Sequence, residues 1–124
     1  MRVLWAFLVL VLSAAGPAFA QDPVIVDSTH YKVEFENEHV RVLRISYGPN
    51  EESVMHYHPA GVGVFLTDQF DGEFTLPDGQ TVKVEAKAGD AIWTEEGLHQ
   101  PRNLSDQPFE LILVELKSPP PAGD

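Results

Sequence analysis

One stretch decides the fold predicted for this chain: Gly89-Asp90-Ala91-Ile92-Trp93-Thr94-Glu95-Glu96-Gly97-Leu98-His99-Gln100-Pro101-Arg102-Asn103. It contains two short segments, 91–93 and 99–103, that follow turn-forming residues. Segments of this length between glycine-containing turns are typical of β-strands rather than helices. We therefore predict two strands joined by a polar turn, with His99 at the start of the second.

Upstream of this stretch, Asp78-Gly79 separates two alternating segments, 70–76 and 80–85. Asp-Gly between alternating segments predicts a β-hairpin. No segment of ten or more residues after position 20 repeats its apolar residues with the helical period of 3.6. These patterns favour an all-β sandwich or barrel. The further predicted strands are 24–26, 31–35, 40–47, 54–58, 62–67 and 109–116.

The N-terminal residues resemble a secretory signal peptide. Arg2 precedes a nearly unbroken apolar run, and the small residues that follow end in Ala18-Phe19-Ala20. The run is shorter than the roughly 20 apolar residues that a membrane-spanning helix needs. We therefore expect residues 1–20 to be a cleaved signal peptide, 21–118 to form a single domain, and 119–124 to be a flexible Pro-rich tail. The mature protein is expected in the periplasm or outside the cell.

Composition narrows the range of partners. The whole chain has 8 basic and 19 acidic residues, a formal net charge of −11, and no cysteine. That charge argues against binding to nucleic acid or, after cleavage, to an anionic membrane surface. Without disulfides, stability must come from the core or from a bound metal.

His56 and His58 flank Tyr57 in a His-x-His motif. On a β-strand, residues two apart point to the same face, so both imidazoles can approach one ion. Two exposed imidazoles without any metal would give the same pattern, and the motif alone is weak.

The motif gains weight from its context. Gly89, Gly97, His99 and Asn103 resemble the second signature of the cupin superfamily, and the His-x-His motif resembles the first. The resemblance covers most of residues 38–116 and implies a small stand-alone cupin, an antiparallel β-sandwich or jelly-roll barrel. It further implies that the two motifs face each other inside the barrel and bind one metal. The ligands would be His56, His58 and His99.

Three departures from the family pattern stand out. The usual glutamate, four or five residues after the second histidine, is replaced by Val62 and Gly63. Glu95 stands in place of the usual proline, and only Leu98 separates Gly97 from His99, one residue fewer than usual. Three neutral imidazoles around a divalent ion leave a formal charge of +2, which favours an anionic ligand.

The resemblance implies one divalent metal, Fe, Mn, Ni or Zn, in a dioxygenase or isomerase-type enzyme that acts on a small anionic substrate. Catalytic residues beyond the ligands are not assigned. The alternatives are a non-catalytic periplasmic module that binds a small ligand or metal, and a cupin with a vestigial site. Small cupins commonly pair, so we expect a homodimer.

Several further residues have two interpretations. His30 and His39 lie outside both motifs and are predicted to be surface or capping residues. Glu95 and Glu96 could reach the mouth of the barrel, although a solvated loop is favoured. Phe65, Phe74 and Trp93 could line the cavity or belong to the core. Asn103 could orient a ligand or end a strand.

Overall fold

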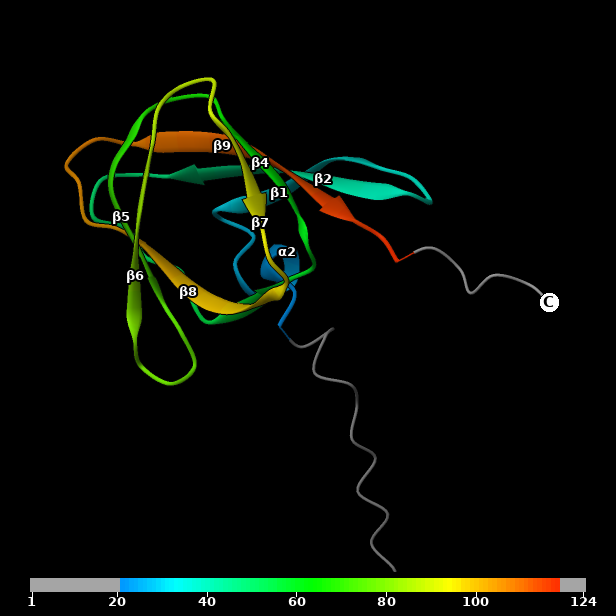
Figure 1. Cartoon of the computed structure of the whole chain (residues 1–124), viewed down its shortest axis with the longest axis horizontal. Coiled ribbons are helices and arrows are strands. Elements are labelled where there is room, and N and C mark those ends of the chain that lie inside the picture. The colour runs from blue at the N-terminus through cyan, green and yellow to red at the C-terminus, as the bar shows by residue number, and fades with distance from the viewer. Residues whose placement is uncertain (1–20, 119–124) are drawn as a thin grey trace, which may run out of the picture.

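The computed structural model describes residues 21–118, so the predicted leader and tail lie outside the described residues. The described part has nine strands and one short helix (Figure 1). The prediction of an antiparallel all-β fold is confirmed. The elements are α2 (Pro23–Val26), β1 (Tyr31–Glu36), β2 (Val40–Tyr47), β3 (His56–His58), β4 (Gly61–Phe65), β5 (Gln69–Thr75), β6 (Thr81–Ala86), β7 (Ala91–Thr94), β8 (Gly97–Asn103) and β9 (Phe109–Leu116).

The strands form two sheets. One has the order β1-β2-β9-β4-β7, and the other has the order β3-β8-β5-β6. Strands β5 and β6 form the predicted hairpin, in which Gly79 adopts a φ of +87° and its amide donates to the Leu76 carbonyl at 2.9 Å. Strands β6 and β7 each end a sheet, and both border the cavity described below.

A cluster of inward-facing side chains from β1, β2 and β9 forms the buried core. Successive side chains of a strand point to opposite faces of the sheet, so every second residue of these strands faces the interior. Burying a side chain of this size contributes about 1.5–3 kcal/mol. The members are Tyr31, Leu43, Ile45, Tyr47, Phe109 and Leu113.

The prediction of a strand over 24–26 is wrong, because Pro23–Val26 forms the single-turn helix α2. The Asp22 side chain accepts a hydrogen bond from the Val24 amide at 3.0 Å, and Pro23 occupies the first turn. This combination starts a helix, and it overrides the strand preference of the two valines and Ile25. Within residues 21–118, no helix has the length and apolar character needed to cross a bilayer.

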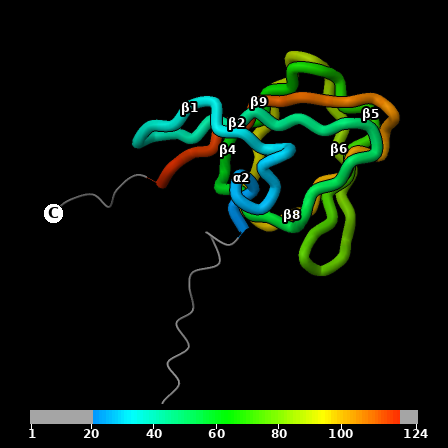
Figure 2. The backbone as a smooth tube through the Cα atoms, turned by 180° about the vertical axis from the view of Figure 1, so that it is seen from behind, coloured from blue at the N-terminus to red at the C-terminus, as the bar shows by residue number. Residues whose placement is uncertain are grey.

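The hairpin of β1 and β2 extends away from the side of the molecule that carries β5 and β6 (Figures 1 and 2). Beyond Tyr31, every residue of β1 is exposed. The short helix α2, which precedes β1 in the chain, contacts both β1 and β3. The N-terminal segment therefore lies beside the strand that carries the His-x-His motif.

Candidate metal centre

The three predicted ligands come together. His56 and His58 alternate with Tyr57 on β3, and antiparallel pairing with β8 puts His99 directly opposite His56. One ligand atom from each of these histidines lies within 4.8 Å of the others. The two motifs are thus hydrogen-bonded neighbours in one sheet, and a single strand register assembles the cluster.

The shortened spacing between Gly97 and His99 does not displace His99. Gly97 has a φ of +155°, a conformation that glycine adopts far more readily than other residues, and β8 begins at Gly97 itself. The following residue, Leu98, pairs with Tyr57, which leaves His99 on the same face as His56.

His56 is fully buried, and its hydrogen bonds define which ring nitrogen is free. Its Nδ1 lies 2.8 Å from the Val54 carbonyl oxygen, so Nδ1 carries the proton and donates. The Nε2 atom is buried and has no hydrogen-bond partner. A buried nitrogen lone pair without a partner is costly unless something binds it, and a metal ion fits that requirement.

His58 is held by a carboxylate from the other sheet. Its Nδ1 lies 2.7 Å from Oε2 of Glu115, which is 2% exposed. The second oxygen of Glu115 accepts from Nε of Arg41 at 2.7 Å, and Arg41 also donates to Asp22. A carboxylate that fixes the Nδ1 proton of a histidine directs Nε2 to a metal and raises its basicity.

Glu115 was not recognised from the sequence, although a signal for it is present. Inward positions of β9 alternate through Phe109, Leu111, Leu113 and Glu115. A charged residue in an otherwise apolar inward series is expensive to bury without a partner. The sequence thus lacks a carboxylate at Val62–Gly63, whereas the fold places one against the outer nitrogen of His58.

Burial keeps the imidazoles of His56 and His99 neutral. The pKa of His56 is lowered from 6.5 to about 4, first by burial and then by the nearby His58. The pKa of His99 is lowered to about 2 by burial and by the other two histidines. Neutral imidazoles are the form that binds a metal ion.

The prediction that His30 is a surface or capping residue is wrong. His30 is 8% exposed, stacks on Tyr47 with ring centroids 4.3 Å apart, and places Nδ1 2.7 Å from Asp27. Asp27 also accepts from the hydroxyl of Ser53, which lies 3.3 Å from Nδ1 of His56. The N-terminal segment therefore reaches the surroundings of His56 through this chain of contacts.

His39 and Asn103 lie outside the cluster. The His39 side chain is 76% exposed, as the sequence predicted. Asn103 is fully buried and donates to the carbonyl groups of Gly48 and Gln107, at 3.0 and 2.8 Å, so it closes a turn. These contacts support the interpretation of Asn103 as a residue that ends a strand.

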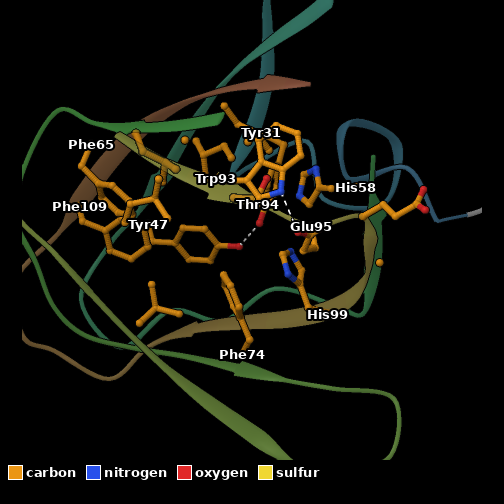
Figure 3. A pocket seen from close by; sticks show the side chains of 18 of the residues that line it. Tyr31, Tyr47, His58, Phe65, Phe74, Trp93, Thr94, Glu95, His99 and Phe109 are labelled. Carbon is orange, nitrogen blue, oxygen red and sulfur yellow. Dashed lines mark hydrogen bonds between the residues drawn. The ribbon is translucent and has the colours of Figure 1, made fainter. Parts of the chain in front are cut away.

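A cavity of about 530 Å³ is lined in part by His58 and His99. Figure 3 shows His58 and His99 at one end and Phe65 and Phe109 at the other. Phe74 packs on His99 with centroids 4.2 Å apart. The interpretation of Phe65, Phe74 and Trp93 as cavity residues is thus supported by their positions in its wall.

Two tyrosines provide polar atoms in the buried part of the wall. The hydroxyl groups of Tyr31 and Tyr47 lie 2.5 Å apart and are hydrogen-bonded to each other. Burial raises the pKa of both groups, so both stay protonated. Glu95 and Glu96 are exposed in the turn between β7 and β8, as expected of a solvated loop, and they also line the cavity at its edge.

No protein-family model matches the chain, and no curated protein matches it significantly. Among solved structures, a cupin domain from Bordetella pertussis Tohama I aligns with a TM-score of 0.65 and 28% identity. That alignment covers 71% of this chain and 92% of the other.

Two further structures share the fold at lower identity. A protein with a double-stranded β-helix domain from Klebsiella pneumoniae has a TM-score of 0.55 and 24% identity, covering 75% of this chain and 78% of that chain. A polyketide cyclase from Streptomyces resistomycificus has a TM-score of 0.52 and 19% identity, covering 73% and 66%.

Proposed function

We propose that this chain, a small single-domain cupin, binds one divalent metal ion through His56, His58 and His99 and acts as a metal-dependent enzyme. The observation that carries the proposal is the buried, unpartnered Nε2 of His56 within a cluster of three imidazoles. The adjoining cavity gives a small organic substrate room to reach the centre.

The chain's own residues prepare the site in three ways. The Val54 carbonyl and Glu115 fix the Nδ1 protons of His56 and His58, leaving each Nε2 free. The low pKa of His56 and of His99 keeps protons from competing at neutral pH. The mostly apolar wall surrounds the centre with groups of low polarity, which strengthens electrostatic interactions there.

A bound divalent ion would supply an electrophilic centre for an oxygen donor of the substrate and, if it is iron, a route to O₂-dependent chemistry. Three neutral ligands leave the charge of the ion uncompensated, so the donor group of the substrate is anionic when bound. We propose Fe, Ni or Zn, which imidazole ligands suit; Mn, the fourth metal that the family resemblance implies, prefers oxygen ligands.

The test is titration of metal-stripped protein with Fe²⁺, Mn²⁺, Ni²⁺ and Zn²⁺ under anaerobic conditions. We expect one ion per wild-type chain and a rise in melting temperature, because an ion that binds only the folded state stabilises it. His58→Ala should lose both responses, whereas His39→Ala, which changes an exposed imidazole, should keep them. Equal responses of wild type and His58→Ala would refute the three-histidine site.

A non-catalytic binding module is the second candidate. Apart from histidines, the buried side chains of the cavity wall within residues 21–118 offer only the paired hydroxyls of Tyr31 and Tyr47 as polar groups. No buried carboxylate there could act as a general base. If metal-loaded protein retains a bound ligand unchanged in the presence of O₂, binding without turnover is the function.

We also propose that the protein is exported and cleaved after Ala20, on the strength of the sequence pattern alone. Mass spectrometry of protein isolated from the native cells should give Gln21, free or cyclised, as the first residue. A mature pool that begins at Met1 would contradict export by this signal.

A further inference from the structure

The opening of the cavity differs in chemistry from its interior. Exposed wall residues mark the opening, and they belong to β6, β7 and the turn that precedes β8. Three of them are acidic, Glu85, Glu95 and Glu96, and one, Lys83, is basic. A ligand group that lies at the opening therefore meets mostly negative charge.

The charge of Lys83 is already engaged elsewhere. Its Nζ lies 3.0 Å from Asp71 and 3.8 Å from Glu73, both outside the cavity wall. Within residues 21–118, none of the three carboxylates at the opening forms an ion pair with a basic side chain. The pKa of the Lys83 ammonium group is raised first by Asp71 and also by nearby Glu85, so the negative charge available to a ligand is that of Glu95 and Glu96.

Neutral donors hold two of these carboxylates in place. The indole Nε1 of Trp93 donates to Glu95 at 2.9 Å, and the hydroxyl of Tyr57 donates to Glu96 at 3.1 Å. In each carboxylate, one oxygen accepts this hydrogen bond, and within residues 21–118 the other oxygen accepts none from a side chain. The carboxylates keep their charge and have capacity to accept from a ligand.

Trp93 adds a second feature that favours a cation. It lines the cavity and is 52% exposed, so part of its ring is open to solvent at the opening. A tryptophan face attracts ammonium groups through its ring quadrupole, and adjacent carboxylates reinforce the attraction. The same surroundings repel a carboxylate.

The interior is suited to an apolar ring. Phe65, Phe109 and Tyr47 are buried in the wall, and Phe74 stands beside His99 (Figure 3). Aromatic walls of this kind hold planar rings by offset or edge-to-face contacts. A cavity of about 530 Å³ is large enough for a single-ring molecule with a short side chain.

We propose that the cavity takes a molecule with an aromatic ring, an oxygen donor for the metal, and an ammonium or other cationic group at the opening. This inference deepens the proposed function and rests on it for the role of the oxygen donor. It restricts where the expected anionic substrate can carry its charge, because the metal attracts a negative group whereas Glu95 and Glu96 repel one.

The test uses three phenols that differ in the charge of one side chain: tyramine is cationic, 4-ethylphenol is neutral, and 4-hydroxyphenylacetate is anionic. Binding is measured at low salt by Trp fluorescence and by calorimetry, in metal-stripped and metal-loaded protein. In metal-stripped protein, tyramine should bind about tenfold more tightly than 4-hydroxyphenylacetate, with 4-ethylphenol between, since each nearby carboxylate changes affinity about two- to threefold. The ratio should shrink as salt is added.

A variant with Glu85→Gln, Glu95→Gln and Glu96→Gln should bind the three phenols with affinities within about threefold of one another. The matched control removes the same charge elsewhere, through Glu38→Gln, Glu52→Gln and Asp106→Asn, and should keep the wild-type ratio. The salt dependence of the wild-type ratio tests the same point without any substitution.

Equal affinities in wild type, tighter binding of the anionic phenol to metal-stripped protein, or no binding of any phenol would overturn the inference. Because the ranking is measured without metal, it is separate from the metal titration. Protein that binds metal but does not rank the phenols refutes only this inference. Protein that ranks them but binds no metal refutes the proposed function.

Discussion

Glu115 shows how a single residue can complete a site that its sequence position does not reveal. It touches His58 on one side and Arg41 on the other, and it is almost fully buried. Burying a carboxylate is costly unless it is paired and hydrogen-bonded, and both conditions hold here. The residue therefore links the stability of β9 to the orientation of a proposed ligand.

Glu115→Gln should weaken metal binding about 10- to 100-fold, because loss of the carboxylate behind a ligating histidine lowers the ligand's basicity and order. It should also destabilise the metal-free protein by about 2–4 kcal/mol, since Arg41 loses a buried partner. The measurements are metal titration and urea denaturation. Glu110→Gln is the control on the same strand, since Glu110 pairs with the partly exposed Arg44 and should cost less than about 1 kcal/mol. Equal metal affinity in both variants would contradict the role given to Glu115.

The lowered pKa values of His56 and His99 predict how the metal-free protein responds to acid. In the unfolded chain both titrate near 6.5, whereas in the folded protein the values are about 4 and about 2. Below pH 6.5 the unfolded state therefore takes up protons that the folded state refuses, and stability falls as pH decreases toward 4. The lowered pKa values of Asp22 and Asp27 act in the same direction but below about 3.8.

We expect the free energy of unfolding of metal-stripped protein to drop by about 5 kcal/mol between pH 7 and pH 4.5, because each of the two histidines contributes about 1.36 kcal/mol per pH unit below 6.5. Chemical denaturation at a series of pH values measures it. His99→Leu should reduce the drop by about half, because the contribution of His56 remains. His39→Ala, which changes an exposed imidazole, should keep the wild-type slope. A wild-type profile without slope in this window would show that these histidines are not buried as described.

Strand β4 packs closely against the backbone of β9 at one of its glycines. It lies between β9 and β7 in the five-stranded sheet, and it contains Gly61 and Gly63. A Cβ atom at Gly61 would come within 2.1 Å of the Val114 carbonyl oxygen, whereas one at Gly63 would approach nothing closer than 3.4 Å. Backbone cannot yield as a flexible side chain can, so the two glycines have different roles.

Gly61→Ala should therefore destabilise the protein by more than about 2 kcal/mol or prevent folding, because β4 and β9 must separate. Gly63→Ala, two residues away on the same strand, should change stability by less than about 1 kcal/mol. Thermal and urea denaturation compare the two variants. Similar losses in both would mean that the close approach of β4 to β9 at Gly61 is not present.

At the level of the whole molecule, the hairpin of β1 and β2, called the arm below, suggests how two copies would associate, because its outer strand β1 is exposed. Strand β1 ends the five-stranded sheet, and it exposes Val33 (44%) and Phe35 (55%). Exposed edge strands with apolar side chains tend to pair with another strand. Together with the commonness of twofold dimers, this supports the expected homodimer.

Light scattering at micromolar concentrations should report a dimer for the wild type. Phe35→Lys should weaken the association at least tenfold, because it places a charge on the apolar face of the arm. Phe70→Lys is the control, since Phe70 is 58% exposed on β5, away from the arm. A monomeric wild type, or equal weakening by both substitutions, would rule out pairing through β1.

Much of the fold follows from local patterns in the sequence. The predicted strands 40–47 and 109–116 and the hairpin predicted at Asp78-Gly79 are elements that the structure contains. The placement of His56 and His58 on one face follows from the two-residue period of a strand. Even the helix at Pro23–Val26 had a local signal in Asp22, which the strand preference of the valines masked.

Tertiary structure alone determines which groups meet. His58 and Glu115 are 57 positions apart, and neither strand's pattern specifies that the other lies behind it. The alignment of His56 with His99, the burial of His30, and the collection of Glu85 with Glu95 at one opening also depend on register and on how the sheets pack. The alternation of residues along a strand determines which face of the sheet each side chain lies on. The side chain that it contacts across the interior depends on strand register and on how the sheets pack, which short sequence patterns do not encode.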